Sequence, residues 1–237
     1  MYRVFGVIAI VLTTFSTSCS GQTVLGVDAA ATSISTSQFQ CLLNNGYKLF
    51  VGRIGQISGP DTSGIQNIRN AQSAGVPYTH AFIFPSAQQN ATVQVDNAIA
   101  ALGSTYVKVL WLDVEKGDWG SNKTANEQFL IQLWHAAAKY LYINYDRVGI
   151  YTSVNNWNQI IGTNSVGDYF YQFPIWYVYA NSNVDPCNGW LNFGGWLYGC
   201  LDEVVHKYAI NVNICGTTVD LNAAAWVGWR TNNGTSV

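Results

Sequence analysis

Two acidic residues, Asp113 and Glu115, stand two positions apart at the end of the apolar run "VLWLDVE" (109–115). The chain has only 13 acidic residues in 237, so a pair at one strand end is a specific feature. Side chains alternate between the two faces of a strand, which places both carboxyl groups on the same face as Trp111. Burial and mutual repulsion should raise the pKa of one of them, giving an acid that can protonate a leaving group. Such a pair suits glycoside hydrolysis.

Two further acids occupy comparable positions in the expected strands. Asp28 follows the apolar stretch "VLGV", and Asp220 lies near the end of the last expected strand. If the first and last strands are neighbours in a closed barrel, both carboxylates converge on the rim that carries Asp113 and Glu115. Two alternatives stay open: each aspartate only caps a loop, or the acids bind a metal ion. The acids lack a close histidine, so we expect no metal and no organic cofactor.

Other kinds of chemistry find little support in the sequence. His80, His135 and His206 lie in apolar or helical surroundings and are expected to be structural. No G-x-S-x-G elbow indicates acyl transfer, and no G-x-G-x-x-G run or P-loop indicates a nucleotide site. The net charge of −2 argues against nucleic acid as a partner, because nucleic-acid binding needs a basic surface.

Strands and helices that would position these acids alternate along most of the chain. Five expected strands, each followed by an expected helix, cover 23–30, 47–55, 77–85, 106–115 and 147–153. The helices cover 35–46, 62–75, 91–103, 124–145 and 154–161. Three strands without convincing helices between them follow at 173–180, 204–212 and 217–224. The pattern predicts an α/β fold, an incomplete TIM-like barrel of five βα units followed by three strands with few helices.

The sheet could be closed or open, and the start of the fourth helix carries a capping signal. An open, doubly wound sheet is the alternative architecture for repeated βα units. The fourth helix is expected to begin with a capping box formed by Thr124 and Glu127, three residues apart.

The composition is that of one large folded domain. Hydrophobic residues make up 49% of the chain and charged residues only 10%, against about 25% in an ordinary globular protein. The 237 residues are ample for one barrel with a sizeable core. Aromatic residues, at 14%, suit a surface that stacks on sugar rings, although they can equally fill a core.

The first 20 residues have the features of a secretory signal peptide, which leaves 21–237 as the mature domain. Arg3 supplies the positive start, and an apolar stretch covers residues 4–12. That stretch is too short to span a bilayer well, although an uncleaved anchor is the alternative. We therefore expect a secreted protein with no membrane association after signal removal.

Four cysteines remain once the signal is removed, and an even number in a secreted chain favours two disulfides. Cys187 and Cys200 flank one loop rich in Gly and Asn, so we pair them and pair Cys41 with Cys215. A zinc site is the alternative, but no CxxC or histidine spacing supports it.

Several motifs occur in an order that resembles a known enzyme family. "GVDAA" opens the mature chain, "LDVE" ends the fourth expected strand, and "PIWYVYA" and "VDLNAA" follow. Together they resemble glycoside hydrolase family 25, the Chalaropsis-type lysozymes or N-acetylmuramidases. The resemblance covers about residues 24–230. Within the family, the chain is most similar to the secreted branch found in nematodes, amoebae and other protists. The family has an incomplete barrel of the predicted kind.

The resemblance implies roles for the four acids. Glu115 matches the general acid that protonates the glycosidic oxygen. Asp113 matches the aspartate that orients the acetamido group of the sugar as that group attacks the anomeric carbon. Asp28 and Asp220 match acids that line the site and tune its charge.

The resemblance also implies substrate-binding residues. Arg53 falls where the family often has an arginine on its second strand. Tyr151 and Trp176 match aromatic positions that stack on or bond to sugar. Phe82, in "HAFIFP", stands about where bacterial members carry a tyrosine, and it lacks the hydroxyl group that would make a polar sugar contact.

The implied function is that of a secreted, monomeric muramidase acting on peptidoglycan glycan strands, in antibacterial defence or in digestion of bacteria. It would cleave the β-1,4 bond between N-acetylmuramic acid and N-acetylglucosamine. The expected location is extracellular, or the lumen of a digestive vacuole or lysosome. The alternatives are a catalytically inactive relative that binds glycans or signals, and a hydrolase of another N-acetylglucosamine polymer such as chitin.

Overall fold

The computed structural model describes residues 23–30, 32–162, 170, 172–196 and 204–225. The predicted signal peptide, residues 1–20, and Cys200 lie outside the described residues.

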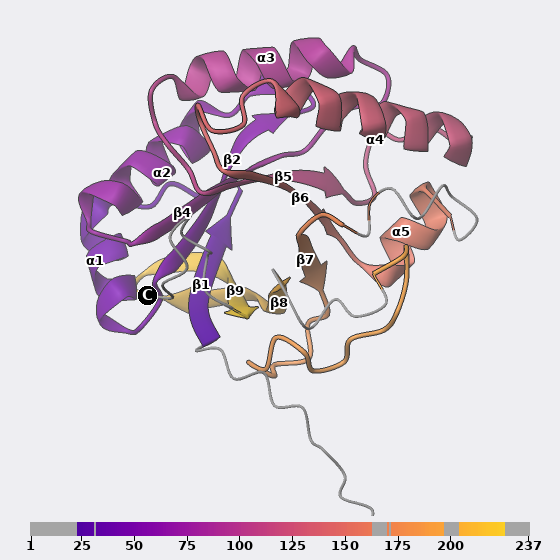
Figure 1. Ribbon diagram of the computed structural model, residues 1–237. Coiled ribbons are helices and arrows are strands. Elements are labelled where there is room, and N and C mark those ends of the chain that lie inside the picture. Colours follow the sequence, from indigo (N-terminus) through magenta and orange to yellow (C-terminus); the bar gives the residue numbers. More distant parts are fainter. Residues whose placement is uncertain (1–22, 31, 163–169, 171, 197–203, 226–237) are drawn as a thin grey trace, which may run out of the picture.

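A closed barrel forms the centre of the molecule (Figure 1). The sheet order is β1-β9-β8-β7-β6-β5-β4-β2-β3, and an additional pairing of β1 with β2 closes it. All strands except the two-residue β3 (Gly59–Pro60), which pairs with β2, belong to the closed barrel. The first five barrel strands are β1 (Thr23–Ala29), β2 (Leu49–Gln56), β4 (Tyr78–Ile83), β5 (Val109–Val114) and β6 (Arg147–Thr152). The last three are β7 (Ile175–Val178), β8 (Val204–Ile214) and β9 (Thr217–Ala225).

Five helices follow the first five barrel strands and cover the outside of that half of the barrel (Figure 1). They are α1 (Thr36–Asn44), α2 (Thr62–Ser73), α3 (Ala91–Leu102), α4 (Lys123–Ala138) and α5 (Val154–Ile160). The described residues between β7, β8 and β9 contain no further helix. The predicted fold, five βα units followed by three strands, is confirmed. None of the helices in the described part of the chain has the length and hydropathy needed to cross a membrane.

The prediction for the fourth helix was wrong at both ends. Asn122 is the N-cap of α4, and its side chain accepts a hydrogen bond from the backbone N–H of Ala125, so Thr124 and Glu127 do not form the expected capping box. The helix ends at Ala138 because the chain then turns, with Tyr142 at a positive φ of 63°. The expected extension to residue 145 is therefore a turn.

The last strand runs opposite to the direction that the prediction assumed. β9 is antiparallel to both of its neighbours, β8 and β1. Its amino-terminal part therefore lies at the rim where the parallel strands have their carboxyl ends. Asp220 is near the start of β9 rather than near its end, and it lies directly opposite Asp28. The two acids converge as expected, but the reversal of β9 is the reason.

Two layers of apolar side chains form the core. The barrel interior contains Leu49, Val51, Phe82, Val109, Trp111, Tyr151, Trp176, Val205 and Ala224. The layer between barrel and helices includes Leu110, Leu112 and Val114 of β5, as strand alternation requires. At the neighbouring strand, a Cβ on Gly149 would lie 2.4 Å from the ring of Trp111, so only glycine allows this close approach.

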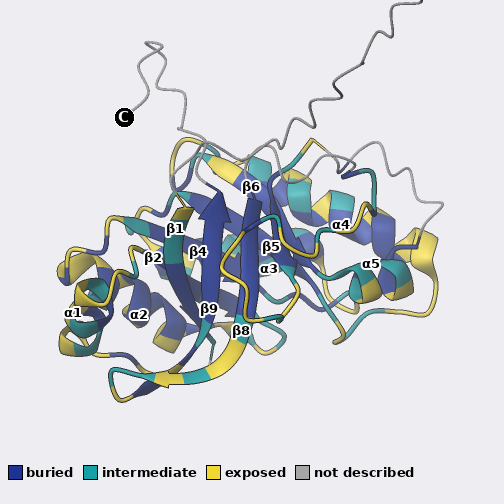
Figure 2. Ribbon diagram, turned by 90° about the horizontal axis from the view of Figure 1, so that it is seen from below, coloured by how far each residue is buried: buried dark blue, intermediate teal, exposed yellow. Residues whose placement is uncertain are grey.

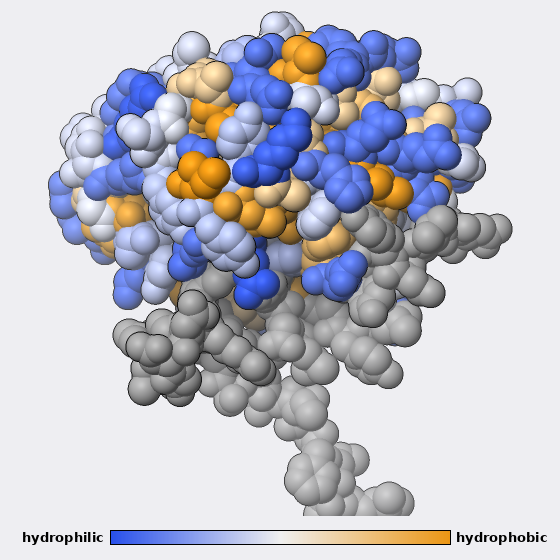
Figure 3. Space-filling view, turned by 45° about the horizontal axis from the view of Figure 1, so that its top comes forward, coloured by the Kyte–Doolittle hydropathy of each residue, from blue (hydrophilic) through white to orange (hydrophobic). Residues whose placement is uncertain are grey.

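The outer surface is mixed in polarity. Figure 2 shows buried strands in the centre and helices whose exposed residues face outward. On the face seen in Figure 3, hydrophilic side chains surround scattered hydrophobic ones. A chain with few charges therefore covers its helices largely with uncharged polar residues.

A disulfide fastens the tip of the β8–β9 hairpin to α1. Cys41 and Cys215 are bonded, as predicted, and they are separated by 174 residues in sequence. Beside this bond, the Gln38 side-chain amide donates a 2.9 Å hydrogen bond to the carbonyl oxygen of Gly216. Cys187 is also disulfide-bonded, while its predicted partner, Cys200, lies outside the described residues.

Replacing Cys41 and Cys215 together by serine is expected to lower the free energy of unfolding by about 2–5 kcal/mol, because a cross-link over so long a loop restricts the unfolded chain. Urea denaturation of the oxidised proteins measures the difference. Gln38→Ala is the control: it removes the adjacent hydrogen bond and the capping-box bond to the Ser35 N–H but keeps the disulfide, and it should cost about 1–2 kcal/mol. Equal stability of the double serine variant and the unmodified chain would contradict this role.

Candidate active site

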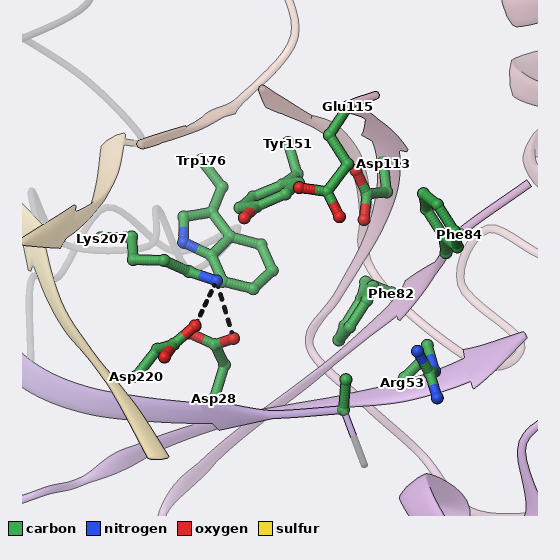
Figure 4. Close-up of a pocket in the computed structure, with 11 residues that line it drawn as sticks. Asp28, Arg53, Phe82, Phe84, Asp113, Glu115, Tyr151, Trp176, Lys207 and Asp220 are labelled. Atoms are coloured by element: carbon green, nitrogen blue, oxygen red, sulfur yellow. Dashed lines mark hydrogen bonds and ion pairs between the residues drawn. The ribbon is translucent and has the colours of Figure 1, made fainter. Parts of the chain in front are cut away.

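One pocket of about 230 Å³ opens at the carboxyl ends of the parallel strands (Figure 4). Every strand of the barrel, or the residues just after it, contributes a side chain. The lining residues are Asp28, Ala30, Arg53, Phe82, Phe84, Asp113, Glu115, Tyr151, Trp176, Lys207 and Asp220. The structure thus brings together all the predicted catalytic and substrate-binding residues, whose roles stay predictions.

Asp113 and Glu115 face the pocket from the end of β5. Asp113 is 1% exposed, and Glu115, one residue past the strand, is partly exposed. Burial and the charge of Glu115 raise the pKa of Asp113 well above its usual value. Burial also raises the pKa of Glu115, against the opposing effect of Lys207. The two side chains share a hydrogen bond, which favours the protonated form of Asp113 and the ionised form of Glu115.

The pair therefore keeps a proton to higher pH than an isolated carboxyl group does. The sequence led us to expect one raised pKa, and the structure raises both. Asp113 is affected more strongly because it is deeper in the barrel. Its Oδ1 atom is buried and accepts no hydrogen bond from the described residues, so this acceptor is unsatisfied.

Asp28 and Asp220 share a cation that the sequence analysis missed. The Lys207 ammonium donates to Asp28 Oδ2 at 2.9 Å and to Asp220 Oδ2 at 3.0 Å (Figure 4). Burial alone would lower the pKa of Lys207, but Asp28, Tyr151 and Asp220 raise it well above its ordinary value. The available signal was a lysine inside the apolar run "VVHKYAINV", because a buried lysine needs a partner.

Asn222 completes the hydrogen bonds around Asp28. Its side-chain amide donates to Asp28 Oδ1 at 2.7 Å and its carbonyl oxygen accepts from the Trp176 indole N–H at 2.8 Å. Burial raises the pKa of Asp28 to about 6, although the Lys207 charge opposes the shift. Asn222 was the second residue that the sequence analysis missed.

The described residues contain no group of three or more histidine, cysteine and acidic side chains placed to hold a metal ion. The Lys207 ammonium lies between Asp28 and Asp220, so a metal ion using these two carboxylates would have to displace it.

Arg53 lies at the opposite edge of the pocket from Lys207 (Figure 4). Its Nε donates a 2.7 Å hydrogen bond to Asp61 Oδ2. Asp61 also caps α2 by accepting from the backbone N–H of Gly64. This anchoring at Nε and Asp61 fixes the direction of the guanidinium group at the pocket edge.

Aromatic rings form the pocket wall and floor. The ring centroids of Tyr151 and Trp176 are 4.3 Å apart, and those of Phe82 and Trp176 are 5.8 Å apart. Beneath them, the Trp111 indole N–H donates to His80 Nδ1 at 3.2 Å. Burial lowers the pKa of His80 to about 3, so this histidine is neutral and structural, as predicted.

The segment after β5 is held by the segment after β4. A Cβ on Gly117 would lie 2.6 Å from the ring of Phe84, so the two segments are in close contact there. Ser86 donates a hydrogen bond to the carboxylate of Asp118, and the backbone N–H of Ala87 donates to the Asp118 carbonyl at 3.0 Å. These contacts fix the backbone that carries the more exposed acid of the pair.

Comparisons with known proteins identify the family and the fold. A family model described as "Lysozyme-like protein 1" matches residues 20–203. Lysozyme-like protein 5 of Caenorhabditis elegans is 30% identical over 196 residues, covering 80% of this chain and 86% of that protein. Probable GH family 25 lysozyme 4 of Dictyostelium discoideum is 30% identical over 209 residues, covering 83% of this chain and 88% of that protein. The solved structure of a muramidase from Acremonium alcalophilum has the same fold, with a TM-score of 0.65 at 16% identity. The match covers 84% of this chain and 92% of that structure.

Asp28 is expected to make the folded state less stable as the pH rises. Its folded pKa, about 6, lies above the ordinary 3.8, so its contribution is fully present below pH 3.8 and is lost as the pH rises through about 6. Asp28→Asn should remove about 3 kcal/mol of this pH dependence. Urea denaturation between pH 4 and pH 7 measures the slope of the unfolding free energy.

Asp146→Asn is the control for this slope. Burial alone would raise the pKa of Asp146, but hydrogen bonds from Tyr106 and Lys108 lower it, so its removal should leave the slope above pH 4.5 unchanged. An Asp28→Asn variant with the full original slope would show that Asp28 is not the group that takes up the proton.

Proposed function

The chain belongs to the glycoside hydrolase family 25 lysozymes and lysozyme-like proteins, and we propose that it is a muramidase. It hydrolyses the β-1,4 bond between N-acetylmuramic acid and N-acetylglucosamine in bacterial peptidoglycan. The observation that carries this proposal is the hydrogen-bonded pair of Asp113 and Glu115, whose raised pKa values keep a proton at the mouth of the barrel. A proton held there is what cleavage of a glycosidic bond requires.

Glu115 acts as the general acid. It lies just past the end of β5 and is the more exposed member of the pair, so it is the one that can reach a glycosidic oxygen. The pair holds a proton before substrate binds, and the hydrogen bond between the side chains lets this proton move between Asp113 and Glu115. Two interacting carboxyl groups titrate as one unit, so this transfer changes no net charge.

Asp113 orients the acetamido group of the sugar. With the shared proton on Glu115, Asp113 is a carboxylate that lines the pocket and can accept the acetamido N–H. The acetamido oxygen then bonds to the anomeric carbon as the bond from that carbon to the glycosidic oxygen breaks. Glu115 protonates the glycosidic oxygen as it leaves. Water next attacks the anomeric carbon, gives a proton to Glu115 and releases the acetamido oxygen, so one water is consumed per bond cleaved.

The aromatic residues and Arg53 bind the sugar. The Trp176 N–H is already bonded to Asn222, so this side chain offers the sugar its ring rather than a donor. Burial raises the pKa of Tyr151, which therefore stays protonated and able to donate a hydrogen bond. Phe82 adds apolar surface beside Trp176, while Arg53 supplies a positive charge at the pocket edge.

We also propose the cellular setting. Residues 1–20 act as a signal peptide and 21–237 as the catalytic domain, which works as a secreted monomer or in the lumen of a digestive vacuole or lysosome, without membrane association. The Cys41–Cys215 disulfide supports an oxidising compartment. The function served is antibacterial defence or the digestion of bacteria.

Glu115→Gln is expected to lower peptidoglycan hydrolysis by about 100-fold or more, because the amide cannot donate the proton that Glu115 supplies. Loss of turbidity and release of reducing ends from purified peptidoglycan measure the rate. Asp96→Asn, on the outer helix α3, is the control and should keep the original rate.

Three outcomes of this assay would change the conclusion. A Glu115→Gln variant with full activity would show that another residue is the acid. An unmodified protein that binds peptidoglycan without cleaving it from acidic to neutral pH would favour the glycan-binding or signalling alternative. Faster cleavage of chitin than of peptidoglycan would change the substrate.

Asp113→Asn is expected to lower kcat by about 100-fold with little change in KM, because the amide cannot become the carboxylate that orients the acetamido group. Peptidoglycan that has lost its N-acetyl groups provides the control. On that substrate the unmodified protein should be slow, and the variant should be no slower. If Asp113→Asn were again about 100-fold slower than the unmodified protein on the deacetylated substrate, the proposed role of Asp113 would be contradicted.

A further inference from the structure

Lys207 connects the strands at which the barrel closes. It lies on β8, and its ammonium reaches Asp28 on β1 at 2.9 Å and Asp220 on β9 at 3.0 Å. The two aspartates are directly opposite each other across the antiparallel β1–β9 pair. Like charges in that position repel, so the strand pair depends on a cation between them.

The hydrogen-bonding capacity of Lys207 is taken up inside the protein. Two of its three N–H groups point to Asp28 and Asp220. The ammonium also lies 4.9 Å from the ring centroid of Tyr151 and 5.0 Å from that of Trp176, which are cation–π distances. Lys207 is 6% exposed and lines the pocket, and its two hydrogen bonds go to Asp28 and Asp220.

Other charged groups face the pocket from the remaining strands. Asp113 and Glu115 do so from β5, and Arg53 from β2. Arg53 is held by Asp61, outside the pocket lining, which compensates its charge. Lys207 is therefore the buried cation beside Asp28 and Asp220, while the charge of Arg53 acts on Glu115 from the pocket edge.

We propose that Lys207 is a positioning residue: it holds Asp28 and Asp220 together against their mutual repulsion and thereby fixes the electrostatic field at the Asp113–Glu115 pair. Its effect on catalysis rests on the proposed function, but its effect on the acids does not. The lysine lowers the proton affinity of both pair members through its charge. Removing that charge must move their titration to higher pH.

Lys207→Met tests this directly. Both limbs of the pH profile of kcat/KM should move to higher pH by about 1 unit, since an opposite charge nearby typically shifts a carboxyl pKa by 1–3 units. A lysine that only stabilised the fold would lower activity without moving the profile. Lys108→Met is the matched control, because it breaks a similar 2.9 Å ion pair, to Asp146, away from the pocket, and should leave the profile in place.

A second measurement needs no activity. Carbon-detected NMR titration of the carboxyl groups in labelled protein gives the midpoints of Asp113 and Glu115 directly. Both midpoints should rise by about 1 pH unit in Lys207→Met. If the unmodified protein proves inactive while the midpoints rise, the proposed function fails and this inference stands. Unchanged midpoints in a folded variant overturn the inference, whatever the activity.

A charge-balanced double variant covers the case in which Lys207→Met does not fold. Lys207→Met with Asp220→Asn removes one positive and one negative charge, so the midpoints should return most of the way toward the original values. If only the double variant folds, it is compared with Asp220→Asn alone, and loss of Lys207 must again raise both midpoints. Midpoints that stay equal in this comparison overturn the inference.

Discussion

Four carboxyl groups meet at the mouth of an apolar barrel, and the arrangement of the site depends on how their charge is compensated. Asp28, Asp113, Glu115 and Asp220 all line the pocket, in a chain with few charges. Isolated buried carboxylates are costly, so each must be protonated or paired. Asp28 and Asp220 are paired through Lys207, whereas Asp113 and Glu115 share a proton. Two solutions to one electrostatic problem therefore divide the pocket into a paired half and a protonated half.

This division follows from the direction of the strands. β9 runs antiparallel to its neighbours, which brings the first residues of the strand to the rim and sets Asp220 opposite Asp28. An irregularity in β8 between Ala209 and Val212 turns the Asn211 backbone N–H toward Asp220, to which it donates at 2.8 Å. The disulfide at Cys215 holds the tip of the same hairpin against α1. The paired half of the site is thus anchored through backbone geometry as well as through charge.

The half that contains Asp113 and Glu115 depends instead on the exclusion of water, which favours the protonated form of a carboxyl group. Asp113 is surrounded by barrel strands whose interior positions hold Trp111, Trp176 and other apolar side chains. Burial is the largest cause of the raised pKa of both acids in the pair. Because Glu115 lies beyond the strand end and Asp113 within it, the pair that shares the proton has one buried member and one more exposed member.

The sequence alone determined the order of the elements and most of the site. Alternating apolar residues marked the strands, and the acids at strand ends placed Asp28, Asp113 and Glu115 at one rim, because parallel strands share an edge. Asp220 was expected at the same rim, but it reaches it because β9 is antiparallel. It did not determine the direction of β9, the start of α4, or the roles of Lys207 and Asn222. Strand direction, and the partner that neutralises a buried charge, are set by contacts between residues far apart in the chain. Lys207 and Asp28 are 179 positions apart, and only the closure of the barrel brings them together.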